Sequence, residues 1–76
     1  MFHGEQNVAI STPFIKLDSL LKLSGLCMTG GEAKMLITEK NVLVNGDACT
    51  QRGRKIMPGD RVQCLGRTLL VTQDAP

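Results

Sequence analysis

The sequence predicts an α+β fold in which two packed helices lie against a small, mostly antiparallel sheet. Two observations support this prediction. Between residues 14 and 37, apolar residues recur at the three- and four-residue spacing of amphipathic helices. From residue 42 onward, short strand-like runs alternate with turns that contain glycine. The 76 residues fit a single domain, 1–76, with a small core over about 14–72 and loose ends at 1–6 and 73–76.

The first helix follows residues 7–11, which alternate weakly and could form a short edge strand. The apolar residues that share one face of this helix are Phe14, Leu17, Leu20 and Leu21. The helix could begin at Thr12-Pro13, with proline in the first helical position, or nearer Lys16, because Asp18 favours a first turn. Gly25 is expected to end it, because glycine readily adopts the left-handed conformation that follows many helices.

The second helix and the hairpin after it give the strongest local signal. Thr29 and Glu32 have the spacing of a capping box at the start of a helix. Lys34 lies off the apolar face, which is made by Ala33, Leu36 and Ile37. The run Val42–Val44 is too short and too β-branched to continue the helix. Asn45-Gly46 then supplies the two positive-φ residues of a type I′ hairpin turn.

The rest of the chain is expected to form short strands joined by turns. In order, the expected elements are a returning strand at 47–49, a loop at 50–55, a type II turn at 57–60, a strand at 61–65, a type II′ turn at Gly66-Arg67 and a last strand at 68–72. The type II turn is indicated by Pro58 and Gly59 at its two central positions. In the strand after it, Val62 and Cys64 face the same side.

The composition limits the possible function classes. A net charge of +2 permits an anionic partner without requiring one. No apolar run approaches the ~18 residues of a membrane span, and no signal-peptide pattern is present, so we expect a cytoplasmic protein. Cys27, Cys49 and Cys64 are odd in number and widely spaced, which fits neither a disulfide framework nor a zinc site, even with His3 as a fourth ligand. We therefore expect reduced thiols, no metal and no cofactor.

Catalysis is not indicated. The single histidine, His3, lies near the terminus, so no Ser-His or Cys-His arrangement can be assembled from it. Gly25 and Gly30 have the glycine spacing of a P-loop, but Gly31-Glu32 occupy the places of its lysine and hydroxyl. The few carboxylates are mostly explained as helix-capping or turn residues. We therefore expect a protein that is not an enzyme.

The basic residues are the remaining candidates for function. From Ala48 to Gly59 there is no acidic residue, and three of the twelve positions are basic: Arg52, Arg54 and Lys55. Any soluble domain carries surface charge, but three uncompensated cations around Gly53 suit an anionic partner. Gly30-Gly31 could expose amides to a phosphate or could simply make a tight turn between helices. The near absence of aromatic residues disfavours base stacking and favours recognition of phosphate and shape.

In order and spacing, these motifs resemble the RNA-binding domain of ribosomal protein S-four, also called the alpha-L motif. The similarity is greatest to the short stand-alone bacterial proteins of the YbcJ-like family, and it covers about residues 14–65. It rests on the following segments: Lys16-Leu17-Asp18 with Leu21, Gly25-Leu26, Gly31-Glu32-Ala33-Lys34 with Ile37, Val42 with Val44-Asn45-Gly46, and Pro58-Gly59-Asp60. Each segment alone is common, whereas their ordered combination is specific.

The resemblance implies that structured RNA, often ribosomal or transfer RNA, lies across the second helix and the hairpin side. The RNA-binding positions that it implies are Lys16, Thr29, Gly30, Lys34, Arg52, Arg54 and Lys55. This sequence departs from the family pattern twice. Gly30-Gly31 replaces a more polar, basic start of the second helix. Lys40 stands where members usually end that helix with glycine, so Lys40 or Asn41 must adopt the left-handed conformation, which Asn41 tolerates better.

We therefore expect non-catalytic binding of structured RNA by a ribosome-associated monomer, with an affinity that falls as salt rises. Two other functions stay open. One is a protein-interaction adaptor whose basic face docks an acidic protein. The other is an accessory subunit of an RNA-modifying enzyme. Nucleic acid that co-purifies and is removed by ribonuclease would favour RNA binding over an adaptor.

Overall fold

The computed structural model describes residues 5–74 and confirms the α+β class. Its elements in chain order are β1 (Glu5–Ile10), β2 (Ile15–Lys16), α1 (Leu17–Leu23), α2 (Gly30–Thr38), β3 (Val42–Val44), β4 (Asp47–Ala48), β5 (Lys55–Ile56), β6 (Arg61–Cys64) and β7 (Arg67–Gln73). Of the ends expected to be loose, residues 1–4 and 75–76 lie outside the described part. The other expected loose residues are not all loose, because Glu5 and Gln6 open β1 and Gln73 ends β7, where it pairs with Ile10.

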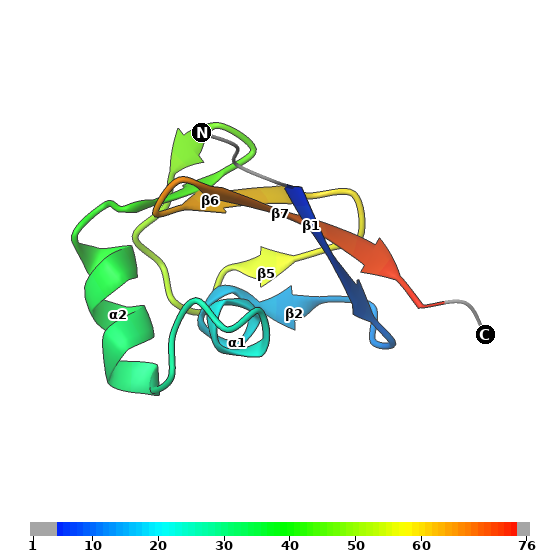
Figure 1. Cartoon of the computed structure of the whole chain (residues 1–76), viewed down its shortest axis with the longest axis horizontal. Coiled ribbons are helices and arrows are strands. Elements are labelled where there is room, and N and C mark those ends of the chain that lie inside the picture. Colours follow the sequence, from blue (N-terminus) through cyan, green and yellow to red (C-terminus); the bar gives the residue numbers. More distant parts are fainter. Residues whose placement is uncertain (1–4, 75–76) are drawn as a thin grey trace.

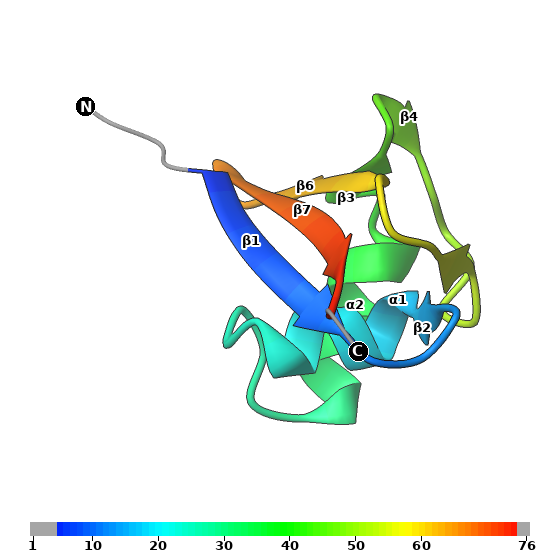
Figure 2. The same cartoon turned by 90° about the vertical axis from the view of Figure 1, so that its right-hand side faces the viewer.

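Five strands form the main sheet, in the order β1-β7-β6-β3-β4. All its neighbours are antiparallel except β1 and β7, which run parallel with Val8 opposite Val71. The edge strand expected at 7–11 is therefore present, and it begins earlier, at Glu5. Figures 1 and 2 show the helices and the short β2–β5 pair on the same side of this sheet.

The core lies between the sheet and the two helices and is aliphatic. It takes Leu17, Leu20 and Leu21 from α1, and Ala33 and Ile37 from α2. The strands contribute alternate residues, among them Val8, Ile10, Val42, Val44, Val62, Cys64, Leu69 and Val71. No polar side chain is buried among the described residues. Neither α1 nor α2 has the length and apolar character needed to cross a membrane.

The first helix starts later than Thr12-Pro13, so that predicted start is wrong and the one near Lys16 is correct. Lys16 is the N-cap and Leu17 the first helical residue. Phe14 precedes the helix and does not share its apolar face, because Ile15 and Lys16 are extended and pair with β5. Gly25 follows the helix with φ +85°, as predicted.

The second helix and its hairpin agree with the prediction. The Thr29 hydroxyl accepts a hydrogen bond from the Glu32 amide at 3.2 Å, and the Glu32 carboxylate accepts one from the Thr29 amide at 3.2 Å. These reciprocal bonds are the predicted capping box. Asn45 and Gly46 both have positive φ, +51° and +91°, and connect β3 to β4. The type II turn is also present, since Gly59 has φ +98° and the Asp60 amide donates to the Met57 carbonyl.

Lys40, and not Asn41, adopts the left-handed conformation after α2, with φ +63°. The reason is the hydrogen-bond pattern that ends the helix. The Lys40 amide donates to the Ile37 carbonyl and the Asn41 amide to the Leu36 carbonyl, which together form a Schellman motif. This motif requires the left-handed residue directly after the C-cap, Glu39, whatever side chain stands there.

Replacing Lys40 by glycine should stabilise the protein. The expected gain in the free energy of unfolding is about 0.5–1 kcal/mol, because removing left-handed strain outweighs the added freedom of glycine in the unfolded chain. Denaturant unfolding of Lys40→Gly measures it. Asn41→Gly is the matched control, since φ is not positive at that position, and it should give no gain. A loss of stability in Lys40→Gly would contradict this explanation.

Two further predictions are corrected in the last third of the chain. The β6–β7 turn is centred on Leu65-Gly66, with φ +55° and +76°, and Arg67 is already in β7, paired with Cys64. The predicted Gly66-Arg67 turn is therefore wrong by one residue, because the prediction assigned the left-handed position to glycine alone. Lys55, expected in a loop, belongs to β5 and pairs with Lys16 of β2.

Candidate nucleic-acid interface

The cations at residues 52–55, called the basic segment below, are positioned by the main chain. Two carbonyl groups of the basic segment accept hydrogen bonds from the first amides of α1. The Leu17 amide donates to the Arg54 carbonyl at 2.9 Å, and the Asp18 amide donates to the Arg52 carbonyl at 3.2 Å. Lys16, the N-cap, makes no side-chain capping bond, so the basic segment satisfies amides that α1 would otherwise leave unpaired. The position of this segment therefore does not depend on its own side chains.

The β2–β5 pairing brings Lys16 to the basic segment. Lys16 and Lys55 are direct partners across the two strands. Like charges directly opposite each other are unfavourable by a few tenths of a kcal/mol or more, and an anion would relieve that repulsion. The ammonium of Lys55 lies 4.8 Å from the centroid of the Phe14 ring, which holds it by a cation–π contact. Sequence reasoning missed both this contact and the strand pair.

The other two cations of the basic segment differ in how far they are neutralised. Arg52 forms an ion pair with Asp18 at 3.5 Å, and the Arg52 side chain stays 48 % exposed. No described residue forms an ion pair with Arg54, Lys16 or Lys55. The segment therefore offers an anion several exposed cations with little internal compensation.

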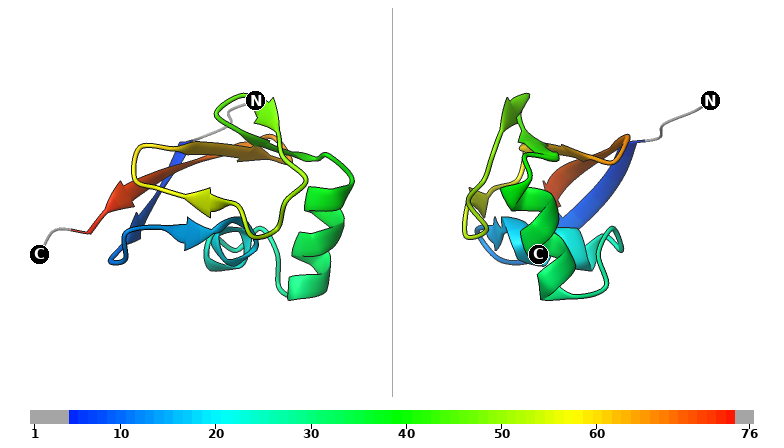
Figure 3. Two further views of the ribbon diagram at one scale, coloured as in Figure 1. Left: turned by 180° about the vertical axis from the view of Figure 1, so that it is seen from behind. Right: turned by 90° about the vertical axis from the view of Figure 1, so that its left-hand side faces the viewer.

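Lys34 is an exposed residue of α2, and at about 100° per residue it falls roughly 200° around the helix from Leu36 and so on the opposite flank. Met35, Leu36 and Glu39 line a groove on the other flank, next to Leu26. Lys34 is exposed and does not line that groove. Figure 3 (right) shows α2 between the 24–29 link on one side and the 49–54 segment on the other. The structure joins Lys16 directly to the basic segment through the β2–β5 pair, whereas the place of Lys34 in the same site stays a prediction.

Thr29 and Gly30 are weaker candidates for phosphate contact. The capping box occupies the Thr29 hydroxyl, and the Glu32 carboxylate accepts hydrogen bonds from the Met28 and Thr29 amides at 2.7 and 3.2 Å. A negative charge already stands where a phosphate would approach the helix. The alternative, a tight turn between the helices, does not involve these glycines either, because Gly30 and Gly31 are the first two residues of α2.

Gly53 also has no conformational requirement in this fold. Its φ is not positive, and a Cβ atom added there would meet nothing within 4 Å. The absence of a side chain leaves the backbone between Arg52 and Arg54 open to close approach. This openness suits a surface partner such as a nucleic-acid backbone.

The three cysteines are free and buried. Burial raises the pKa of the Cys27 thiol, and the nearby Glu32 carboxylate raises it further. Burial also raises the pKa of the Cys64 thiol, with a smaller effect from Cys27 in the same direction. Within residues 5–74, no group of histidine, cysteine or acidic residues could hold a metal ion. His3 lies outside these residues. That the thiols are reduced and metal-free stays a prediction, and stoichiometric zinc found by elemental analysis would contradict it.

Comparisons with known proteins support one family. Residues 8–72 match the S4 domain. The chain is 41 % identical over 59 residues to a probable ribosome maturation protein, RlbA of Bacillus subtilis (strain 168), covering 78 % of this chain and 83 % of that protein. It is 37 % identical over 59 residues to YbcJ of Escherichia coli (strain K12), covering 78 % and 84 %.

The fold agrees with a solved structure of that second relative. The solution structure of YbcJ from E. coli superposes with a TM-score of 0.65 and 31 % identity, over 95 % of this chain and 96 % of the other. That structure is described as revealing an αL motif involved in RNA binding. Two helices on a mostly antiparallel sheet, as found here, are thus the arrangement of a solved relative whose motif is described as involved in RNA binding.

Proposed function

The chain belongs to the S4 domain family, and on this basis we propose that it binds structured RNA without catalysing a reaction on it. The observation that supports this most directly is the backbone-anchored cluster of Lys16 and the basic segment. Its cations are exposed and almost unpaired, and hydrogen bonds to α1 and the β2–β5 pair hold their backbone in place. Preorganised cations of this kind neutralise phosphates at little conformational cost.

Lys34 extends the proposed surface along α2, and Thr29 and Gly30 form its outer margin. The cations contact phosphates in this proposal, while Gly53 lets the RNA backbone approach closely. Phe14 is the one aromatic residue in the described range 5–74, and its ring is engaged by Lys55, so it offers no free platform for a base. Recognition therefore depends on the shape and charge of folded RNA rather than on stacked bases.

The RNA in this proposal is ribosomal RNA or a precursor of it. The similarity to a B. subtilis protein named for ribosome maturation supports this choice over transfer RNA. We propose that the protein acts as a monomer in the cytoplasm, where ribosomes are assembled. A small basic domain without catalytic groups suits a factor that holds RNA during such a process.

The test is binding to a structured ribosomal RNA fragment at several salt concentrations. We expect Lys34→Glu to raise the Kd by about tenfold at low salt, because it replaces an attraction by a repulsion. Arg67→Glu is the control. It reverses a charge next to the β6–β7 turn, which lies at the opposite edge from the 49–54 segment (Figure 3, right).

The outcome separates RNA binding from the adaptor function. An affinity that does not change with salt, or equal effects of Lys34→Glu and Arg67→Glu, would contradict the proposed surface. If an acidic protein displaces the RNA while no structured RNA binds tightly alone, the basic face is a protein-docking surface.

A further inference from the structure

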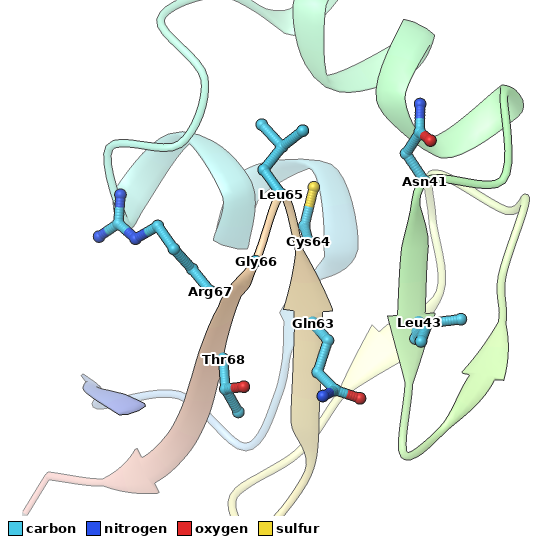
Figure 4. A pocket seen from close by; sticks show the side chains of 8 residues that line it. All are labelled: Asn41, Leu43, Gln63, Cys64, Leu65, Gly66, Arg67 and Thr68. Atoms are coloured by element: carbon cyan, nitrogen blue, oxygen red, sulfur yellow. The ribbon is translucent and has the colours of Figure 1, made fainter. Parts of the chain in front are cut away.

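A second surface lies on the other flank of α2. It is a groove of about 310 Å³ between this helix, the link from α1 and the β6–β7 turn. Its lining residues are Leu26, Cys27, Glu32, Met35, Leu36, Glu39 and Leu65. Figure 4 shows Leu65 projecting from the turn toward the helices. The groove is mostly apolar, and it lies opposite the flank that carries Lys34.

Leu65 is unfavourable for the fold in two ways. It has φ +55°, a conformation that side chains beyond glycine and asparagine adopt at a cost, and 62 % of its surface is exposed. The β3–β4 hairpin shows the usual solution, with Asn45-Gly46 in the same two left-handed positions. A leucine in this place is therefore not explained by the turn, and its side chain lines the groove.

Exposed methionines extend this apolar surface. Met35 lines the groove and is 59 % exposed, and Met28 is 84 % exposed. The Met28 amide donates to the Glu32 carboxylate at 2.7 Å, so the Met28 backbone lies next to a residue that lines the groove. Methionine is flexible and polarisable, so it adapts to the side chains of a protein partner.

The charges of the groove define the partner. Its only charged lining residues are Glu32 and Glu39, and neither forms an ion pair with a described residue. Glu39 is the C-cap of α2, where the helix dipole disfavours a negative charge. The groove therefore attracts cations and repels phosphate, unlike the basic face of the same helix.

We propose that this groove docks a short, basic, amphipathic segment of a protein partner. An apolar side chain of that segment packs between Met35 and Leu65, and its lysines or arginines lie against Glu39 and Glu32. RNA is disfavoured as an occupant by the two carboxylates. Because the groove and the basic face lie on opposite flanks of α2, the domain can hold a protein segment and RNA together.

The probe for this proposal is a synthetic helical peptide with leucine on one face and lysine on the other. Fluorescence anisotropy gives its affinity, and backbone amide shifts in NMR spectra locate it. We expect Leu65→Asn and Met35→Gln each to weaken binding by about tenfold, as loss of a central apolar contact does. Glu39→Gln should weaken it by about threefold.

The matched control is Met57→Gln. Met57 is 55 % exposed but does not line the groove, so this variant should bind the peptide as the parent protein does. Weaker peptide binding by Leu65→Asn cannot be caused by unfolding. Asparagine suits the left-handed position, so this variant should melt at or above the temperature of the parent protein. RNA affinity should be unchanged in Leu65→Asn, which keeps this test independent of the proposed RNA function.

Control peptides test the chemistry of the partner. Peptides with serine in place of leucine, or glutamate in place of lysine, should not bind. Equal binding of the serine peptide, or amide shifts away from the groove, would overturn the proposal. So would loss of RNA binding in Leu65→Asn. Self-association in sedimentation that Leu65→Asn abolishes would assign the groove to a second copy of this chain and would equally overturn it.

Discussion

Replacing Arg52, Arg54 and Lys55 together with alanine should abolish most RNA binding while the domain stays folded. If each of the three cations contacts a phosphate, their loss should flatten the plot of log K against log salt by roughly 2–3, by a relation calibrated on DNA. The measurement is binding to structured RNA at several salt concentrations, with thermal melts of the same samples. A triple variant that melts normally and binds RNA like the parent would show that the basic segment is only solvated surface.

The fold should tolerate this change, because the main chain holds the basic segment in place. The carbonyls of Arg54 and Arg52 accept the α1 amides whatever side chains are present. Two contacts are lost: the exposed Arg52–Asp18 pair, worth at most about 1 kcal/mol, and the Lys55–Phe14 contact, worth about 0.5–1 kcal/mol. The sequence alone showed neither contact.

Matched controls separate charge from structure in the triple variant. Asp18→Asn breaks the same ion pair but leaves all three cations, so it should lower stability slightly and keep RNA binding. Phe14→Leu removes the ring under Lys55 and should behave in the same way. Arg67→Ala removes a cation near the β6–β7 turn and should change RNA binding little. If Asp18→Asn lost as much RNA affinity as the triple variant, the ion pair rather than the charge would be responsible.

The elements that could be predicted are those whose signals are local. A capping box at Thr29 and an Asn45-Gly46 turn each define geometry within a few residues, and both are present as predicted. The β2–β5 pair could not be predicted in this way. Each strand has two residues, too few for a period, and the partners Ile15 and Ile56 lie far apart in sequence.

The errors at single turn positions have a common cause. The predictions assigned left-handed conformations to the residues that adopt them most readily, whereas hydrogen bonds and strand register decided them. The Schellman motif fixed Lys40, and the pairing of Cys64 with Arg67 fixed Leu65. Lys40 and Leu65 therefore hold left-handed conformations that lower the stability of the fold. In the case of Leu65, the cost coincides with an apolar groove.

The candidate site also combines a feature that is local in the sequence with one that depends on long-range strand pairing. The acid-free run that holds Arg52, Arg54 and Lys55 was visible in the sequence, but its connection to Lys16 depends on the strand pair. Lys16 was implied only by family resemblance, and the structure supplies the physical link through its pairing with Lys55. Whether these cations bind RNA remains the prediction that the charge variants test.

Truncating Ile56 to alanine should be the most destabilising of the changes considered and should also weaken RNA binding. Ile56 is fully buried and pairs with Ile15, so it fixes β5 to β2 and to the core. The expected loss in the free energy of unfolding is about 2–4 kcal/mol, from lost burial and the cavity left behind. Denaturant unfolding measures it, and Ile56→Val should lose only about 1 kcal/mol.

The second part of this prediction depends on position rather than on stability. Val71 is equally buried, but it lies in β7 and contacts no part of the basic segment through strand pairing. At a low temperature where both variants are folded, Ile56→Ala should weaken RNA binding more than Val71→Ala. The reason is that loosening β5 releases Lys55 from its place opposite Lys16, whereas loosening β7 does not. Equal RNA affinities of the two folded variants would mean that RNA binding does not require the β2–β5 pair.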